Sequence, residues 1–181
     1  MRLGDVSFDG CNVMDIKIGA ITWDHQASSE KIQLERSKYL WQEKLGFRIL
    51  GYRCTRSDGQ VEVLSKEKAK KLDPEEVQSA IWTFLSPDGD RIVLERRRSI
   101  FVRQLEQIKE VIEQETSFQF ISSSILLSYK KVPFVHDHSD EEAKATMIDF
   151  AHTFQTPCYQ VDVNYLMGLS SLITFFKPKE E

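Results

Sequence analysis

Alternation of apolar and polar residues with a period of two marks the first candidate strand, at residues 11–19. Its methionine and two isoleucines fall on one side, whereas Asp15 and Lys17 fall on the other. Such alternation is typical of a strand that buries one face only. The pattern therefore predicts a strand that contributes one side to the core and presents a carboxylate and an ammonium group on the other.

Apolar periodicity, capping residues and turn residues divide the rest of the chain into further elements. Asp73 and Pro74 open one helix with a cap and a proline at the first position, and Gly46 follows another helix where a C-terminal glycine is expected. The predicted strands are 47–54, 118–129 and 145–150, with a turn at 57–59 and a polar loop at 132–142. One helix is predicted to begin within 24–30 and to end at about Lys44, and another runs from 74 to a break at 87–90. Two more helices are predicted at 92–115 and 161–176, and residues 66–71 are interpreted as a solvated helix face. Mixed strands and long helices without a repeat or linker predict a single α+β domain over residues 1–181.

Composition narrows the class of protein. The chain has 181 residues, of which 41% are hydrophobic and 29% charged, an ordinary balance for a soluble domain with a core. A net charge of −4 disfavours non-specific binding to nucleic acid. No apolar run approaches the roughly 18–20 residues that span a bilayer, and the first residues lack the apolar core of a secretory signal. We expect a monomer without membrane or nucleic-acid partners.

Cysteine usage bears on the compartment. The three cysteines, Cys11, Cys54 and Cys158, are odd in number, and none forms a C-x-x-C pair. This argues against a disulfide framework or a zinc ribbon and suits a reducing compartment. We therefore expect the protein in the cytoplasm, the nucleus or both.

The Asp15-x-Lys17 pair is the first candidate for chemistry. Residues two apart on a strand project to the same side. A carboxylate placed there can orient or deprotonate a hydroxyl, and the ammonium group can neutralise a phosphoryl group. The alternative is an ordinary charged pair on a half-exposed strand, which the spacing by itself favours.

A second candidate is Asp149, an acidic residue at the end of the predicted apolar strand 145–150. Magnesium prefers one or two carboxylates together with phosphate oxygens, and strand ends are places where such sites form. The alternative is an acidic strand end that serves solubility only. His136 and His138 with the intervening aspartate could also bind a metal, although a solvated acidic loop explains them better.

A basic segment supplies the third candidate. Lys31 and Lys38 lie seven residues apart and share a helix face, and Arg53 lies on the following strand. Together these cations could bind several phosphates. The alternative is a solvent-exposed helix whose glutamates balance its lysines.

Taken in order, these segments resemble the inositol polyphosphate kinase family, and most closely its multikinase branch. The family signature P-x-x-x-D-x-K-x-G stands here at residues 11–19, with Cys11 in place of the proline. The other matches are Ala27–Lys31 with Ser37–Tyr39, Leu45–Phe47 and Gly51–Arg53, the S-S-L-L box at Ser122–Leu126, the I-D-F-A-H box at Ile148–His152, and the D-x-x-Y-x-x-G-L helix at Asp162–Leu169. Five boxes in order over nearly the whole chain are specific, whereas one alone would be a coincidence.

The resemblance implies a fold, an activity and a set of roles. The fold would be the C-terminal lobe of an inositol polyphosphate kinase, which is protein-kinase-like and SAICAR-synthase-like, with an antiparallel sheet and packed helices. The activity would be ATP-dependent phosphorylation of inositol polyphosphates. Asp15 and Lys17 would be catalytic, and Asp149, supported by Ser124, would bind the magnesium ion that ATP carries. Lys31, Lys38 and Arg53 would bind substrate phosphates, and His152 would lie close to the substrate. Asp5 would bind the nucleotide ribose.

The start of the chain departs from the family. Hinge-like residues Leu3–Asp5 stand at the beginning, and Asp5 is two residues nearer to Asp15 than the family pattern predicts. We therefore expect the β-rich N-terminal lobe to be missing and ATP binding by this chain to be weak.

Three alternatives stay open at this point. The first is an inactive isoform that binds inositol phosphates or proteins, the second is an inositol hexakisphosphate kinase, and the third is an unrelated α+β domain with chance matches.

Overall fold

A five-stranded antiparallel sheet forms the centre of the computed structural model, which describes residues 10–130, 143–156 and 159–177. The strand order is β3-β2-β1-β5-β6, so that β1 lies in the middle. The strands are β1 Cys11–Ile18, β2 Phe47–Thr55, β3 Val61–Leu64, β5 Ser124–Lys130 and β6 Lys144–Ile148. A separate two-stranded sheet pairs β4 Phe118–Phe120 with β7 Thr153–Gln155.

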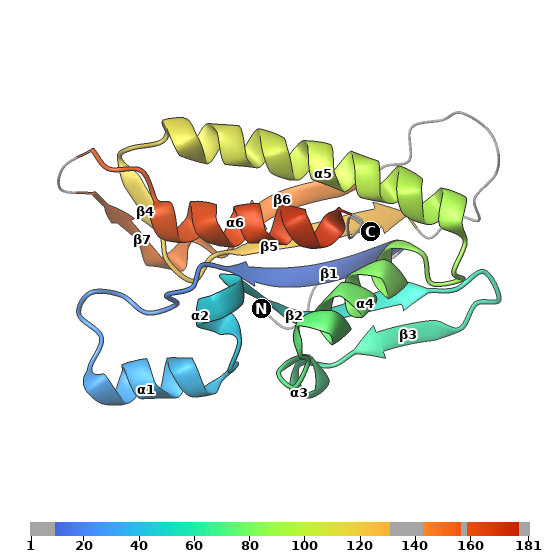
Figure 1. Ribbon diagram of the computed structural model, residues 1–181, viewed down its shortest axis with the longest axis horizontal. Helices are drawn as coiled ribbons and strands as arrows, with labels where there is room; N and C mark the ends of the chain where they lie inside the picture. The colour runs from blue at the N-terminus through green and yellow to red at the C-terminus, as the bar shows by residue number, and fades with distance from the viewer. Residues whose placement is uncertain (1–9, 131–142, 157–158, 178–181) are drawn as a thin grey trace.

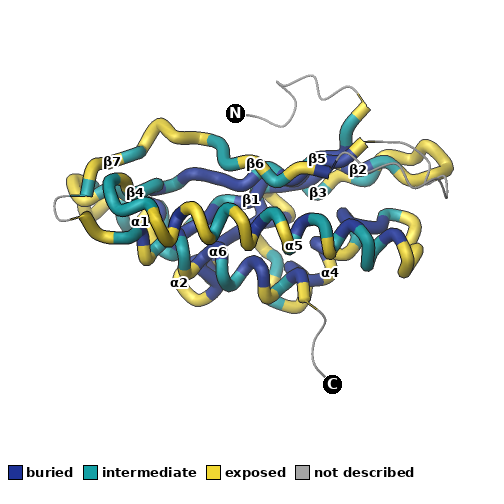
Figure 2. Tube along the Cα trace, turned by 90° about the horizontal axis from the view of Figure 1, so that it is seen from above, coloured by how far each residue is buried: buried dark blue, intermediate teal, exposed yellow. Residues whose placement is uncertain are grey.

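Three helices cover one face of the large sheet: α4 Pro74–Leu85, α5 Arg91–Gln114 and α6 Val163–Phe176 (Figures 1 and 2). The remaining helices are α1 Ser29–Ser37, α2 Gln42–Leu45, α3 Lys66–Ala69 and the short 3-10 helix η1 Phe150–His152. The core lies between the sheet and α4, α5 and α6, where Met14, Ile16 and Ile18 of β1 are fully buried. Because side chains alternate along a strand, Asp15 and Lys17 point to the face away from these helices. The α+β class and the direction of these two side chains are confirmed. The prediction that this strand buries one face only is wrong, because Val13 and Asp15, on the face away from the helices, are only 2% and 7% exposed.

Aspartates begin the three long helices. Asp73 and Glu76 form the capping box at α4, and the Asp90 carboxylate accepts hydrogen bonds from Ile92 N and Val93 N at α5. Asp162 Oδ1 accepts from Tyr165 N at 2.9 Å, and its Oδ2 accepts from Phe120 N at 2.7 Å. The third cap therefore also attaches α6 to β4. Among the described helices, none has both the length and the apolar character needed to cross a bilayer.

Two of the predicted elements are wrong in their extent. The helix expected as far as Lys44 ends at Ser37 and resumes as α2 at Gln42. The intervening Tyr39 is buried and donates to Leu72 O at 2.9 Å, so tertiary packing overrides the helical preference of this segment. The strand expected over 118–129 is two strands of different sheets, because Ser122 adopts a left-handed conformation with φ of 60°. The short strands β3 and β7 were not predicted.

Three glycines bring α6, β1 and α2 into main-chain contact. Gly19 N donates to Gly46 O at 2.7 Å, and Gly46 ends α2 in the left-handed conformation with φ of 72°. A Cβ atom at Gly168 of α6 would lie 2.1 Å from Gly46 O and 2.8 Å from Gly19 N. Only glycine fits at position 168, so this three-glycine contact sets how closely α6 approaches the end of β1.

Candidate functional site

The candidate site lies on the central strand, on the sheet face away from α4, α5 and α6. In the register, Lys17 lies between Arg48 of β2 and Ser124 of β5, and Asp15 lies opposite Gly51. The pairing of β1 with β2 shifts between Asp15 and Ile16, which is a β-bulge. Bulges bend a strand and redirect its side chains, and here the bulge lies directly beside Asp15.

Asp15 is a buried carboxylate, with 7% of the residue exposed. Burial raises its pKa, and the Asp149 carboxylate acts in the same direction, while the nearby Ser124 hydroxyl and the Lys17 ammonium oppose the shift. Asp15 Oδ1 and Ser124 Oγ make no hydrogen bond that is evident among the described residues. A carboxylate with a raised pKa and an unpaired oxygen is suited to accept a proton from a bound hydroxyl.

Lys17 is held by Ser122. Its Nζ donates to the Ser122 main-chain oxygen at 2.5 Å and to Ser122 Oγ at 2.8 Å. Burial lowers the pKa of Lys17, and the Arg48 guanidinium adds to this, whereas Asp15, Asp149 and Glu35 oppose it. The left-handed Ser122 therefore directs two oxygens at one ammonium group, a contact that the sequence pattern did not reveal.

Asp149 follows β6 and is the second non-glycine residue of the site with a left-handed backbone, at φ of 64°. Its side chain is exposed and makes no capping hydrogen bond to η1. It lies near enough to influence the pKa of both Asp15 and Lys17. Backbone strain of this kind concentrates at functional sites.

The Asp149 carboxylate fits a magnesium ion that is shared with phosphate. No group of three or more His, Cys, Asp or Glu suited to a metal occurs in the described part of the chain. Magnesium in phosphate-transfer sites needs only one or two carboxylates, because phosphate oxygens and water complete its octahedron. The exposed Asp149 satisfies that requirement, whereas Asp15 Oδ1 is buried.

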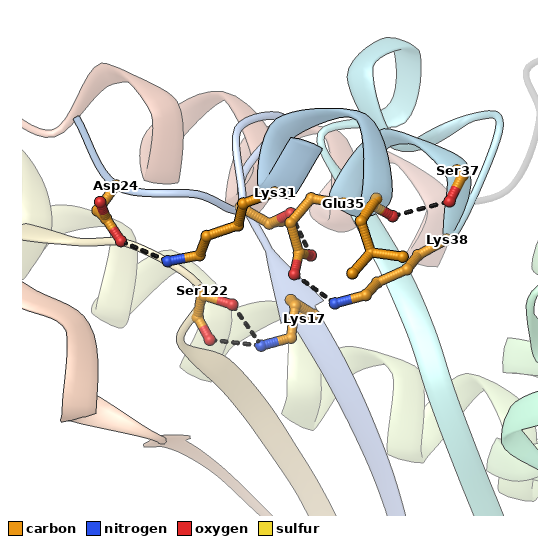
Figure 3. Close-up of polar contacts among 9 residues, drawn as sticks. Lys17, Asp24, Lys31, Glu35, Ser37, Lys38 and Ser122 are labelled. Atoms are coloured by element: carbon orange, nitrogen blue, oxygen red, sulfur yellow. Dashed lines mark hydrogen bonds and ion pairs between the residues drawn. The ribbon is translucent and has the colours of Figure 1, made fainter. Parts of the chain in front are cut away.

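Lys31 and Lys38 reach the same region from α1 and from the residue that follows it. Figure 3 shows both side chains beside Lys17, with Glu35 between them. Lys31 Nζ pairs with Asp24 at 2.8 Å, and Lys38 Nζ pairs with Glu35. Both lysines thus lie in the neighbourhood of Lys17, and their binding of phosphate stays a prediction.

Arg48 is a site residue that the sequence reasoning missed. It lies directly opposite Lys17, is 5% exposed, and its Nη1 has no hydrogen-bond partner among the described residues. Burial lowers its pKa, and Glu35 opposes that shift. An arginine in the otherwise apolar start of the segment 47–54 was the available signal, because a buried guanidinium needs a partner.

Other predicted residues lie apart from this cluster or were not located. Arg53 is exposed and pairs with Val13, four residues before Lys17 and so roughly 13 Å along the strand at about 3.3 Å per residue. His152 is exposed in η1, and its main-chain oxygen accepts from Ile121 N at 3.1 Å. Ser124 is fully buried beside Lys17. Asp5 and the His136–His138 loop lie outside the described residues.

Known proteins resemble this chain in sequence and in fold. Residues 5–177 match the family described as inositol polyphosphate kinase. Curated relatives include inositol hexakisphosphate kinase 3 of Mus musculus, 30% identical over 93% of this chain and 47% of that protein, and inositol polyphosphate multikinase alpha of Arabidopsis thaliana, 29% identical over 92% and 63%. The human inositol polyphosphate multikinase is 30% identical over 72% of this chain and 32% of that protein. The chain thus spans 32% to 63% of these relatives' length.

Solved structures agree with the sequence matches. A structure from protein-engineering work on an inositol phosphate multikinase superposes with a TM-score of 0.77 at 27% identity, covering 97% of this chain and 82% of that one. The inositol phosphate multikinase Ipk2 of S. cerevisiae, solved with ADP and Mn2+, superposes with a TM-score of 0.78 at 24% identity, covering 94% and 78%. The second likeness shows the fold.

Proposed function

This chain belongs to the inositol polyphosphate kinase family, and from that premise we propose that it carries the phosphoryl-transfer site of a kinase that uses ATP to phosphorylate inositol polyphosphates. The observation that supports this most is the juxtaposition of Asp15, Lys17 and Asp149 beside a cluster of cations. A base, a phosphoryl-binding cation and a metal-binding carboxylate are the components that phosphoryl transfer needs.

In the proposed reaction, a substrate hydroxyl attacks the γ-phosphorus of ATP. A new oxygen–phosphorus bond forms to the inositol, the bond from the γ-phosphorus to the β,γ-bridging oxygen breaks, and ADP leaves. Asp15 orients the hydroxyl and accepts its proton, which its raised pKa favours. Lys17, held by Ser122, binds the transferred group and offsets the negative charge on its oxygens.

Asp149 is proposed to hold a divalent cation, and magnesium is the expected ion. When bound, the ion would neutralise the nucleotide phosphates and fix their position. Asp149 is suited to this because it is exposed and its backbone is held in a strained conformation by the turn between β6 and η1.

Lys31, Lys38 and Arg48 are proposed to bind the phosphates already present on the inositol. Arg48 Nη1 has no hydrogen-bond partner among the described residues, and the two lysines would exchange their carboxylate partners for phosphate. Arg53 and His152 are proposed as outer contacts, because both are exposed and neither side chain lies in the cluster of Figure 3.

Labelled ATP and inositol trisphosphate, tested on the full chain by equilibrium binding and by a transfer assay, separate the candidate functions. Transfer that Asp15→Asn abolishes and that Glu110→Gln leaves unchanged supports a kinase, since Glu110 is exposed on α5, which covers the opposite face of the sheet. Binding of the trisphosphate without ATP binding would favour a module that recognises inositol phosphates. Binding of neither ligand would contradict the proposal.

Within the family, we propose the multikinase branch, because the boxes at 27–31 and 37–39 resemble it. A hexakisphosphate kinase is the alternative, and relatives of both kinds match this chain at similar identity. Transfer to inositol trisphosphate in preference to inositol hexakisphosphate would support the multikinase assignment, and the reverse preference would overturn it.

A further inference from the structure

Glu35 is an acidic residue at the centre of a site that otherwise gathers cations. It projects from α1, and its side chain is only 14% exposed. Its Oε1 accepts from Lys38 Nζ, and its Oε2 accepts from Thr22 Oγ1 at 3.2 Å. Figure 3 shows the carboxylate directed toward the ends of Lys17 and Lys38.

The surrounding charges identify what Glu35 interacts with. Burial alone would raise its pKa, but Lys38, Thr22 and Arg48 together hold the pKa below its usual range. Glu35 in turn counteracts the fall in the pKa of Lys17 and of Arg48. One carboxylate therefore lies within the field of three cations that come from β1, β2 and the end of α1.

A simple surface ion pair does not explain this placement. Glu43 offers the comparison, because it also pairs with a basic residue of α1, Arg36, at 2.7 Å. The Glu43 side chain is 56% exposed, as is usual for surface pairs. Glu35 instead enters the site, where an anion is balanced by groups that would otherwise bind phosphate.

We propose that the Glu35 carboxylate occupies a phosphate position between Lys17, Lys38 and Arg48, and that it thereby selects inositol polyphosphates with a hydroxyl at that position. This inference rests on the proposed function and adds a specificity determinant to it. A hydroxyl can donate to the carboxylate, whereas a phosphate presents only negative charge and acceptors. A ligand with phosphate there must displace Glu35 from its cations.

Inositol trisphosphate and inositol hexakisphosphate distinguish the two cases. The trisphosphate has free hydroxyls and can place one of them against Glu35. The hexakisphosphate bears phosphate on every ring carbon, so no orientation avoids the repulsion. Selectivity against the hexakisphosphate should therefore depend on the charge of residue 35.

The experiment is calorimetric titration of both ligands into the full chain, the Glu35→Gln variant and the Glu43→Gln control. Glutamine keeps one oxygen that can accept from Lys38, and its amide nitrogen can donate to Thr22 Oγ1, so the fold should persist. A Glu35→Ala variant provides a second form without charge. We expect Glu35→Gln to raise affinity for the hexakisphosphate about tenfold, since removing a like charge at close range has this order of effect in a partly buried site. Affinity for the trisphosphate should change by less than about threefold.

The outcomes separate this inference from the proposed function. If both ligands bind but Glu35→Gln and Glu35→Ala change their affinities by the same factor, or if Glu43→Gln has the same effect, Glu35 does not set selectivity and only this inference falls. If a folded wild-type chain binds neither ligand, the proposed function fails and the inference fails with it.

Discussion

At the scale of single residues, the site combines groups that each carry a cost for folding. Asp15 is buried without a full set of hydrogen bonds, and Ser122 and Asp149 adopt left-handed backbones that favour glycine. Such groups usually persist where function requires them and the surrounding structure fixes them. Whether each of these residues stabilises or destabilises the fold can therefore be tested separately from its effect on activity.

Asp15→Asn should make the protein more stable at neutral pH while it abolishes phosphoryl transfer. The pKa of Asp15 is raised above its ordinary value of 3.8, so its contribution to stability is present below that value and is lost as pH rises through the folded-state pKa. Asparagine does not ionise. We expect a gain of about 1 kcal/mol, or about 2–4 °C in Tm, measured by thermal unfolding at pH 7.

The gain should shrink as pH falls toward the ordinary carboxyl range, because wild-type Asp15 then becomes protonated. A Glu110→Gln control on the exposed side of α5 should show no comparable gain. A variant that is less stable at pH 7 would show that the Asp15 carboxylate stabilises the fold.

Two substitutions of Ser122 should agree in activity and differ in stability. Ser122→Ala and Ser122→Gly both remove the hydroxyl that accepts from Lys17 Nζ, so each should lower the transfer rate by roughly three- to thirty-fold. Only glycine accommodates φ of 60° at no cost, so Ser122→Gly should be the more stable by about 1 kcal/mol. Steady-state kinetics and thermal unfolding give the two readouts. Equal activity of Ser122→Ala and wild type would remove Ser122 from the positioning of Lys17.

At the scale of elements, helix starts and ends form where local sequence signals predict them, unless a contact with a distant residue overrides those signals. The Asp73 cap, the proline after it and the Gly46 terminus were predicted from the sequence and occur as predicted. The break at Tyr39 was not predictable, because it depends on a contact with Leu72 more than thirty residues away. The division at Ser122 was hidden because an unbroken apolar and hydroxyl run resembles one strand.

Helix α1 should be the least protected element of the site. None of its residues is buried, and contacts such as the pair of Arg36 with Glu43 and the stacking of Arg36 on Trp23 attach it at its surface. Hydrogen exchange should be fast in α1 and slow in α6, where the core positions are buried. Inositol trisphosphate should slow exchange in α1. Protection of α1 equal to that of α6 without ligand would contradict this.

Gly168→Ala should destabilise the protein more than a helix-propensity argument allows. Alanine is normally the better helix former, but its Cβ would lie 2.1 Å from Gly46 O. We expect a loss of about 1–3 kcal/mol in denaturant unfolding. Thr174→Ala, at an exposed position of the same helix, is the matched control and should change stability little. A stabilised Gly168→Ala protein would mean that α6 can move away from Gly46 at little cost.

At the scale of the whole molecule, the order of the sequence boxes was enough to identify the family and the fold class. The boxes are far apart in sequence, yet β1, β5 and the end of β6 lie side by side in the sheet and bring Asp15, Lys17, Ser124 and Asp149 together. The cation cluster was only partly predictable. Arg48 lies opposite Lys17 because of the bulge between Asp15 and Ile16, whereas Arg53 lies opposite Val13, outside the cluster.

Inositol polyphosphates should stabilise the whole chain in a salt-dependent way. A ligand that binds only the folded state adds about 2.7 kcal/mol at a concentration of 100 Kd. Because the proposed site binds through several cations, the increase in Tm should fall markedly between low salt and about 0.5 M salt, where charges are strongly screened. Glucose at the same concentrations is the uncharged control. A shift in Tm that does not depend on salt would argue against binding through Lys31, Lys38 and Arg48.

The three-glycine contact has a consequence for how this protein tolerates change. Gly19 lies two residues after Lys17, and it meets Gly46 and Gly168 through main-chain atoms only. Side chains of the core can therefore be exchanged and repacked while the distance between α6 and the end of β1 stays the same. Substitutions in the core should therefore leave the position of Lys17 unchanged, so that sequences of low overall identity can keep the same geometry at this residue.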